Sequence, residues 1–183
     1  MTFGILAWSL VAAGLLALLL GGDLRNLGLL RIRVWWLLPT ALLLKITAIT
    51  LDLPPAPWAQ PAVFGLVAIG LVANWRLPGA ALVGCGLLLN VLVTVSNGGV
   101  MPFSASALEA AGRPVSRAEA GGAFGHPDSQ DTRLAWLDDR IPFPPTHQAF
   151  SVGDIFVMAG GAWLVIGASR PARLTRLGRL RAA

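Results

Sequence analysis

Lys45 and Asp154 are the two ionisable side chains inside the long apolar runs of this 183-residue sequence. An ionisable group at membrane depth costs a few kcal/mol, which makes each a candidate functional residue. At about 1.5 Å of rise per residue, Lys45 and Asn90 lie at nearly the same depth, and Asp154 lies near one end of its run. One interpretation is a polar cavity lined by these three residues. In the alternative, the lysine stem extends to the membrane surface, and Ser151 with Asp154 caps the start of a helix.

The histidines and the cysteine predict no cofactor site. Both histidines, His126 and His147, stand outside the apolar runs, which excludes a haem held by two transmembrane histidines. They could gather with nearby aspartates around a metal, but the spacing typical of zinc ligands is absent. Cys85 is the single cysteine, so no internal disulfide can form. We therefore expect neither a metal nor another cofactor.

The elements that must position these residues are long apolar runs. Hydrophobic residues make up 55% of the chain and charged residues 13%, against about 45–50% and about 25% in soluble domains. Five runs are long enough to cross about 30 Å of hydrocarbon as helices. The sequence thus predicts an all-α class, with one integral membrane bundle of about five transmembrane helices and an outer cap segment. The spans are expected at about residues 3–20, 34–53, 58–75, 80–97 and 150–168, and the cap at 98–149.

The distribution of charge predicts the orientation. With the N-terminus outside, the inner segments carry nine arginines and one acid, whereas the outer segments carry four arginines and seven acids. This positive-inside pattern is typical of a bacterial inner (cytoplasmic) membrane protein whose C-terminus is cytoplasmic. The net charge of +5 then belongs to an anchor that includes the basic tail at 169–183. We expect the lipid bilayer, and not nucleic acid, to be the partner of these arginines.

The predicted cap is too long to be a simple connector. Ser106, with Glu109 three residues later, is typical of a capping box for a short helix that Gly112 can end. Asp131 could cap a second helix around residues 134–137. The proline-rich stretch 141–145 is expected to run extended into the last span.

Ala80 and Gly84 are small residues four positions apart in the fourth span. Such a pair lets another helix approach closely. Internal packing is the favoured interpretation. A homo-oligomer or a membrane-protein partner at this face is the alternative.

Two motifs carry a resemblance that covers essentially the whole chain. Residues 97–102 read Asn-Gly-Gly-Val-Met-Pro, and residues 150–154 read Phe-Ser-Val-Gly-Asp. In these motifs and in its several spans, the chain resembles a family of uncharacterised bacterial multipass membrane proteins known as a domain of unknown function. The resemblance implies a binding or structural motif and no particular activity. Its residues here are Asn97, Gly98, Gly99, Met101, Pro102, Ser151 and Gly153.

The start of the last span is also similar in spacing to the motif that opens the last span of lipoprotein signal peptidases; the matching residues are Phe150, Asp154, Val157 and Gly160. In that family the aspartate is one of a catalytic pair. The resemblance therefore implies that Asp154 shares a proton with a second carboxylate and activates water. Asp139, or its neighbour Asp138, would be that partner. The Gly-Asn-x-x-Asp-Arg segment of the peptidases is missing.

Three functions stay open at this point. The favoured one is a non-catalytic binding or accessory protein, whose outer cap and turn at 97–102 bind a partner protein, a lipid or a small molecule. The second is an aspartyl peptidase-like enzyme that uses Asp154 with Asp139. The third is a small oligomeric transporter or channel, in which Lys45, Asn90 and Asp154 line the route.

Overall fold

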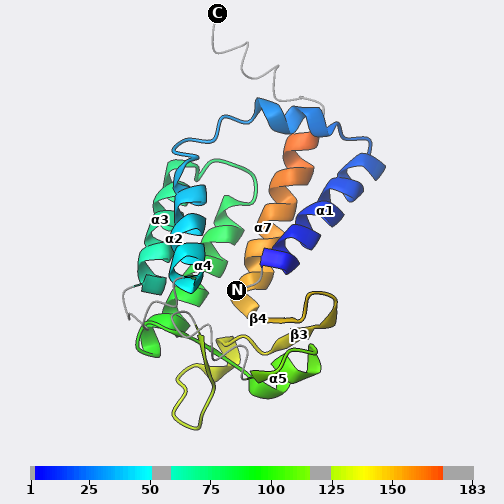
Figure 1. Cartoon of the computed structure of the whole chain (residues 1–183). Helices are drawn as coiled ribbons and strands as arrows, with labels where there is room; N and C mark the ends of the chain where they lie inside the picture. Colours follow the sequence, from blue (N-terminus) through cyan, green and yellow to red (C-terminus); the bar gives the residue numbers. More distant parts are fainter. Residues whose placement is uncertain (1–2, 51–58, 116–124, 171–183) are drawn as a thin grey trace, which may run out of the picture.

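The computed structural model describes residues 3–50, 59–115 and 125–170. Most of these residues are helical, and five longer helices run between two ends of the molecule (Figure 1). Helices α2, α3 and α4 form one group, and α1 packs against α7 in a second group. The two groups meet where α4 packs along α7. The five helices are α1 (Phe3–Leu19), α2 (Leu37–Thr50), α3 (Ala59–Ala73), α4 (Ala80–Ser96) and α7 (Val152–Ser169).

Each predicted span overlaps one of these helices, which confirms the mostly helical class. Helix α2 begins at Leu37, three residues later than the predicted span. The cause is Val34, whose φ of 47° lies in the left-handed region and therefore cannot continue a right-handed helix. Of the predicted span at 34–53, residues 51–53 lie outside the described residues, as does the tail from 171 onward.

By length and composition, α7 is the one helix in the described part of the chain that could cross a membrane. Its 18 residues correspond to about 27 Å. Three further helical stretches are apolar but shorter, at Gly4–Leu19, Gln60–Ala73 and Ala80–Ser96. The prediction of five membrane crossings therefore remains a prediction.

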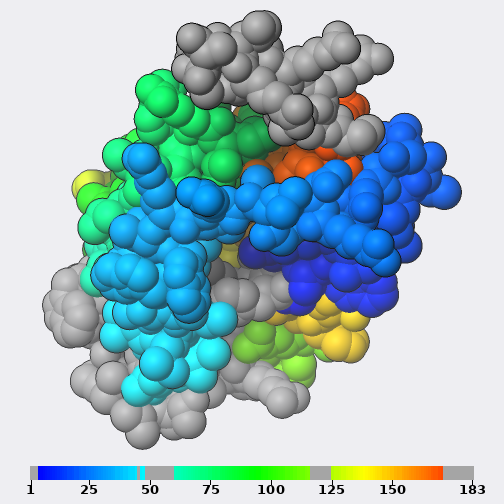
Figure 2. All heavy atoms as spheres, turned by 90° about the horizontal axis from the view of Figure 1, so that it is seen from above, coloured from blue at the N-terminus to red at the C-terminus, as the bar shows by residue number. Residues whose placement is uncertain are grey.

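The segment between α1 and α2 lies across one end of the helices. It contains the short 3-10 helix η1 (Leu24–Leu29), which packs against the end of α7. Figure 2 looks onto this end and shows the segment passing over the orange end of α7. The Asp23 amide and the Asn26 side chain both donate to the carbonyl oxygen of Ser169, at 2.8 and 3.2 Å. The end of α7 is thereby fixed to the segment that follows α1.

The cap closes the opposite end of the helices (Figure 1). Its described residues contain one short helix, α5 (Ala105–Ala110), and two small sheets that the sequence did not predict. Strands β1 (Met101–Phe103) and β2 (Gly125–Pro127) pair in parallel, and β3 (Ile141–Phe143) and β4 (Gln148–Phe150) pair antiparallel. The described part of the cap also contains two 3-10 turns, η2 (Ala135–Leu137) and η3 (Pro144–Thr146). The all-α prediction thus holds for the bundle but omitted the strands of the cap.

Two details of the predicted cap are wrong. Helix α5 is capped by Ser104, whose side chain accepts a hydrogen bond from the Ala107 amide, and not by Ser106. The second helix, predicted to be capped by Asp131, is a 3-10 turn preceded by Leu134, which has a φ of 55° and supplies no side-chain cap. Gly112 ends α5 as predicted, because its φ of 80° is easily reached only by glycine.

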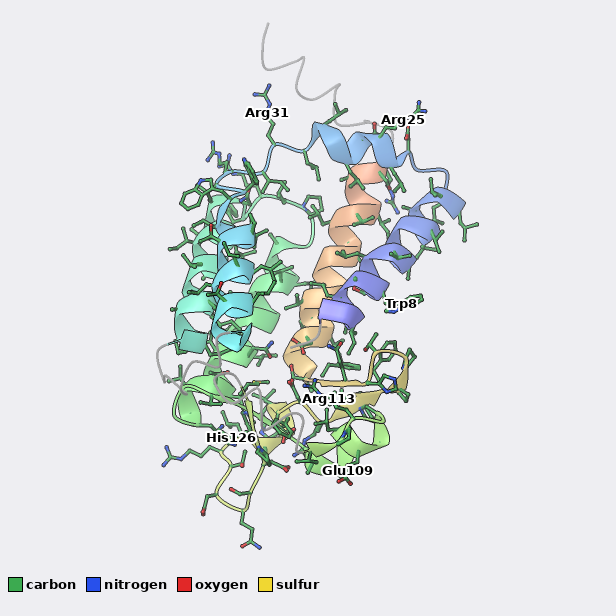
Figure 3. All side chains as sticks on the ribbon, viewed as in Figure 1. Trp8, Arg25, Arg31, Glu109, Arg113 and His126 are labelled. Carbon is green, nitrogen blue, oxygen red and sulfur yellow. The ribbon has the colours of Figure 1, made fainter. Side chains whose placement is uncertain are left out.

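Charged side chains gather at the two ends of the molecule. Figure 3 shows Arg25 and Arg31 beside the segment after α1, and Glu109 and Arg113 in the cap at the opposite end. Between these ends the helix surface carries exposed apolar side chains such as Trp8, which is 59% exposed.

Candidate functional site

The candidate site is a polar cluster of Asn90, Ser151 and Asp154 at the junction of α4 and α7. The Asn90 amide nitrogen donates to Asp154 Oδ1 at 3.0 Å, and the Ser151 hydroxyl donates to Asn90 Oδ1 at 3.0 Å. Asn90 and Ser151 are buried, and Asp154 is half-buried. Asn90 thus uses both ends of its amide to join α4 to the first turn of α7.

Ser151 and Asp154 also form the predicted helix cap. The Asp154 amide donates to Ser151 Oγ at 3.1 Å, and the Ser151 amide donates to Asp154 Oδ2 at 3.3 Å. This reciprocal pair is a capping box, which satisfies amides that have no partner in the first turn of a helix. The carboxylate also lies at the positive end of the helix dipole. Both oxygens of Asp154 therefore have a structural use.

Glycines bring the two helices close enough for these bonds. A β-carbon on Gly153 would overlap the Asn90 side-chain amide and lie 2.8 Å from the Gly86 carbonyl oxygen. A β-carbon on Gly86 would in turn overlap the Gly153 carbonyl oxygen. The same reciprocal contact recurs between Gly79 and Gly160 nearer the other end. We call these four residues the glycine seam.

The small-residue pair predicted in α4 also packs inside the chain. Ala80 is buried, and a β-carbon on Gly84 would lie 3.2 Å from the Leu71 side chain of α3. This geometry agrees with the favoured internal packing. The closest approach to α7 is made by Gly79 and Gly86, which are seven residues apart, and not by the predicted pair.

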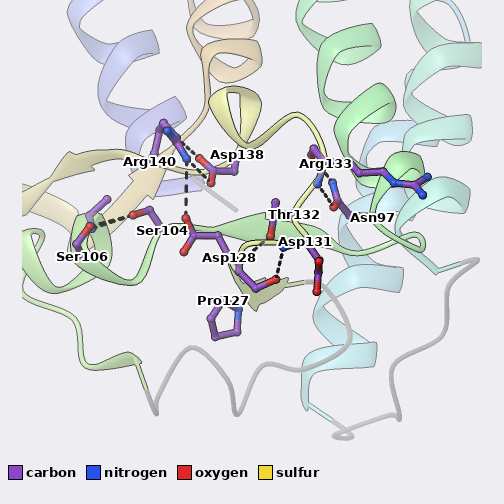
Figure 4. A network of polar contacts seen from close by, with 12 residues as sticks. Asn97, Ser104, Ser106, Pro127, Asp128, Asp131, Thr132, Arg133, Asp138 and Arg140 are labelled. Carbon is purple, nitrogen blue, oxygen red and sulfur yellow. Dashed lines mark hydrogen bonds and ion pairs between the residues drawn. The ribbon is translucent and has the colours of Figure 1, made fainter.

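The turn after α4 joins the helices to the cap. The Asn97 side chain donates to the Val93 carbonyl at 2.7 Å and to the Arg133 carbonyl at 2.8 Å, and its Oδ1 accepts from the Arg133 amide at 2.9 Å. Gly98 and Gly99 have φ values of 73° and 88°, which reverse the chain. Figure 4 shows the two bonds that join Asn97 to Arg133.

Met101 and Pro102 of the same motif are buried in the cap. The Thr94 hydroxyl contacts the Met101 sulfur at 3.5 Å, and the Pro102 carbonyl accepts from the Asp139 amide at 3.2 Å. These contacts give the motif a structural role, as one of the two alternatives expected. A binding role for this motif stays a prediction.

Asp138 and Asp139 have different surroundings. The Asp138 side chain is fully buried and pairs with Arg140 through two bonds, from Nε at 2.5 Å and from Nη2 at 3.0 Å. Arg140 Nη2 also lies 3.8 Å from Asp128 Oδ2 (Figure 4). Asp139 is half-buried, and its backbone carbonyl accepts from the Ser104 amide at 3.0 Å. Asp138 therefore supports the cap, and the catalytic pairing of Asp139 with Asp154 stays a prediction.

The electrostatics of the cap centre on Arg140. Its hydrogen bond with Asp138 is the main cause that raises its pKa above the ordinary arginine value. Burial acts in the opposite direction, and the charges of Asp138 and Asp128 add to the rise. Arg140 thus stays positively charged at every ordinary pH and neutralises the buried Asp138 carboxylate.

The remaining candidates are distributed over the fold. Lys45 lies in α2, and its side chain is outside the described residues. His126 Nδ1 lies 2.8 Å from the Pro127 carbonyl, and His147 Nδ1 lies 3.0 Å from the Ala111 carbonyl. Among the described residues, no three His, Cys, Asp or Glu side chains come together as a metal site would require.

Asn74, just after α3, makes a set of hydrogen bonds like that of Asn97, and the sequence did not predict it. Its amide nitrogen donates to the Gly70 carbonyl at 2.7 Å and to the Arg33 carbonyl at 2.8 Å, and its Oδ1 accepts from the Arg33 amide at 2.8 Å. This is the arrangement of Asn97 with Val93 and Arg133, repeated at the opposite end of the molecule. An asparagine just beyond an apolar helix was the available signal.

The fold and the site define a class: a helical bundle with an apolar surface, a basic end and a folded cap that asparagine and glycine residues hold in place. The chain belongs to DUF5317, a family of unknown function, whose model matches residues 29–166, or 138 of the 183 residues. No curated protein and no solved structure matches the chain. The family match agrees with the expected domain of unknown function, and it assigns no activity.

Proposed function

We propose that the chain is a multipass protein of the bacterial inner membrane and acts as a non-catalytic binding or accessory protein through its outer cap. The observation that carries the membrane placement is the apolar surface of the helices. Trp8 on α1, Ile46 on α2, Val72 on α3, Leu88 on α4 and Trp163 on α7 are each 49–70% exposed. Soluble monomers rarely expose contiguous apolar patches larger than a few hundred Å². Hydrocarbon is the solvent that suits such a surface.

The proposed orientation follows from the charges at the two ends. The end with Arg25, Arg31 and Arg33 faces the cytoplasm, and the cap with its buried and exposed acids faces outward. Helices somewhat shorter than the hydrocarbon thickness can be accommodated by local thinning of the bilayer or by anchoring side chains at the interface. Trp35 and Trp75, which are 66% and 67% exposed at the arginine end, fit such an interfacial position.

Membrane placement can be tested by extraction and labelling. In a Cys85→Ser background, single cysteines replace Glu109 in the cap and Arg31 at the other end. We expect the protein to stay in membranes after an alkaline carbonate wash. An impermeant maleimide should label Glu109→Cys in intact spheroplasts, and Arg31→Cys only after lysis. Release into the wash would refute membrane integration, and the reverse labelling would refute the orientation.

The non-catalytic assignment is supported by how the polar groups are used. Asp154 serves the capping box and Asn90, Asp138 pairs with Arg140, and Asn97 holds Arg133. These bonds make the cap a folded unit attached to the bundle. Trp136 in the cap is 59% exposed, and tryptophan is enriched among residues that dominate protein interfaces. We propose that Trp136 contributes to the binding surface for a partner protein.

Co-purification in gentle detergent tests this role. Trp136→Ala should reduce the amount of a stably associated protein at least several-fold, as expected for loss of an interface anchor. Trp75→Ala, at the opposite end, should leave it unchanged and is the matched control. Equal recovery with both variants would refute binding at the Trp136 surface.

The peptidase alternative makes a different prediction for Asp154. Asp154→Asn keeps an oxygen that can accept the Ser151 amide but removes the ionised carboxylate. A peptidase would lose cleavage of a prolipoprotein reporter, whereas a binding protein would retain its partner. Loss of reporter cleavage in a variant of normal stability would overturn the non-catalytic assignment.

A further inference from the structure

A pocket of about 200 Å³ lies between α2, α3, α4 and α7 at the arginine end of the molecule. Its walls are almost wholly apolar, and they include Leu38, Val67, Leu71, Val83 and Leu164. Gly70 of α3 also lines it, and a β-carbon on that glycine would meet nothing within 4 Å. The pocket therefore leaves open space directly beside α3.

The strap of residues 32–35 forms the mouth of this pocket. Ile32, Arg33, Val34 and Trp35 all line it, and Ile32, Arg33 and Trp35 are exposed. Asn74, another lining residue, fixes the strap by bonding both the amide and the carbonyl of Arg33 at 2.8 Å. Val34 is held at a positive φ of 47°, a strained conformation for a β-branched residue. The mouth is thus built from a constrained segment that places an arginine beside an apolar pocket.

We propose that this pocket holds an acyl chain of an anionic phospholipid, whose phosphate is bound by Arg33 with help from Arg31 and Arg76. The inference rests on the membrane placement proposed above. Arg31 is exposed and directly precedes the strap, and Arg76 lies on the loop between the lining residues Asn74 and Leu77. The guanidinium fork matches phosphate oxygens in geometry and charge.

The chemistry of the mouth decides which lipid binds. An acyl chain gains little by leaving other lipid tails for an apolar pocket, because both surroundings are equally apolar. Selectivity must therefore come from the headgroup, where three arginines favour a net negative charge over a zwitterion. The cytoplasmic leaflet, which the arginine end is proposed to face, carries anionic lipid. A helix from a second copy is about 10 Å wide, whereas a pocket of about 200 Å³ suits a slender acyl chain.

Native mass spectrometry of the full chain in detergent tests the site. Dioleoyl phosphatidylglycerol and dioleoyl phosphatidylcholine are titrated separately, and the fraction with one bound lipid is measured. We expect clear preference for phosphatidylglycerol. Gly70→Leu places a side chain in the open space and should lower binding of both lipids. Gly65→Leu is the matched control, because Gly65 lies on the same helix, is exposed, and also has nothing within 4 Å of its β-carbon.

A second pair of variants tests the headgroup contact. Arg33→Gln removes the charge but keeps the backbone bonds to Asn74, so the strap should stay in place. It should reduce phosphatidylglycerol affinity roughly fivefold, the effect of one arginine near anionic lipid, and reduce phosphatidylcholine affinity less, because that lipid carries the phosphate but no net charge. Arg25→Gln, exposed at the same end but outside the pocket, should have no such effect.

The results separate this site from the membrane placement on which it rests. Equal binding of both lipids, or equal effects of Gly70→Leu and Gly65→Leu, would overturn the lipid site while carbonate-resistant membrane association still held. A dimer that forms without bound lipid and is lost in Gly70→Leu would assign the pocket to a second copy and would also overturn it. Release from membranes by carbonate would instead refute the membrane placement, and with it the source of the lipid.

Discussion

Replacing Gly153 with alanine should separate α4 from α7 at the polar cluster. The new methyl group would occupy the space of the Asn90 side-chain amide and press on the Gly86 carbonyl oxygen at 2.8 Å. Neither neighbour can move cheaply, because one is backbone and the other is held by bonds to Ser151 and Asp154. The helices must therefore shift apart, or the cluster must break.

The expected loss of stability can be estimated from both causes. Overpacking a close contact costs about 1–3 kcal/mol, and an interhelical hydrogen bond within a membrane contributes about 0.6 kcal/mol. With two such bonds at Asn90, the total is about 2–4 kcal/mol. At about 2–4 °C per kcal/mol for a chain of this size, Gly153→Ala should lower Tm by about 4–16 °C.

Thermal unfolding of the purified protein in detergent is the assay, and Gly65→Ala is the matched control. Gly65 is an exposed helical glycine with open space around its β-carbon, so its replacement should be neutral or stabilise by up to about 1 kcal/mol. Asn90→Ala in the Gly153→Ala background should recover part of the loss, since it removes one of the two obstructing groups. If Gly153→Ala unfolds at the same temperature as Gly65→Ala, the close approach of α4 and α7 is refuted.

Three further predictions concern the hydrogen bonds and the ion pair of the cap. Asn97→Ala removes three hydrogen bonds and should destabilise by about 1–3 kcal/mol, seen as faster hydrogen exchange of cap amides near Arg133; exchange confined to α4 would contradict it. Arg140→Gln leaves the buried Asp138 carboxylate without its half-exposed partner and should cost about 1–3 kcal/mol, with partial recovery when Asp138→Asn is added. Because the pKa of Arg140 is raised, its charge contributes fully below the ordinary arginine pKa and is lost only as pH rises through the higher folded value. Unfolding by denaturant should therefore show no loss of the Arg140 contribution between pH 7 and 10, and a loss in that range absent from Arg140→Gln would refute the pairing.

The sequence was enough to predict elements that depend on local patterns. Five apolar runs predicted five helices, since hydrophobic length needs no tertiary information. The pair of Ser151 and Asp154 predicted a helix cap, and the structure confirms it. Gly112 predicted a helix end, because glycine readily takes the left-handed conformation that follows a helix. Ser106 was predicted as the cap because Glu109, three residues later, completes a capping pattern, whereas Ser104, which does cap the helix, has Ala107 at that position.

Other parts of the site depend on which segments meet, and local patterns do not contain that information. Asn90 and Ser151 are 61 positions apart, and their contact follows from the antiparallel alignment of α4 with α7. The strands of the cap are three residues each, too short for a period-two pattern to indicate a strand. Asn74 was missed because its partner, the backbone of Arg33, has no side-chain signature. Asp138 was considered as a catalytic acid, but its burial beside Arg140 could be known only from the fold.

The glycine seam explains why the polar cluster lies where it does. Gly79 faces Gly160, and Gly86 faces Gly153, so each step of seven residues along α4 matches a step of seven in the opposite direction along α7. Seven residues are close to two helical turns, which keeps Gly153 and Gly160 on one face of α7. On the other side of the contact, Gly86 lies in α4 and Gly79 is the residue just before it. Without β-carbons the backbones meet directly, and Asn90, one turn beyond Gly86, then reaches the start of α7. The hydrogen bonds of the cluster are therefore a consequence of the seam. Changes at the glycines should disrupt the cluster, whereas changes within the cluster should leave the contact between Gly79 and Gly160 intact.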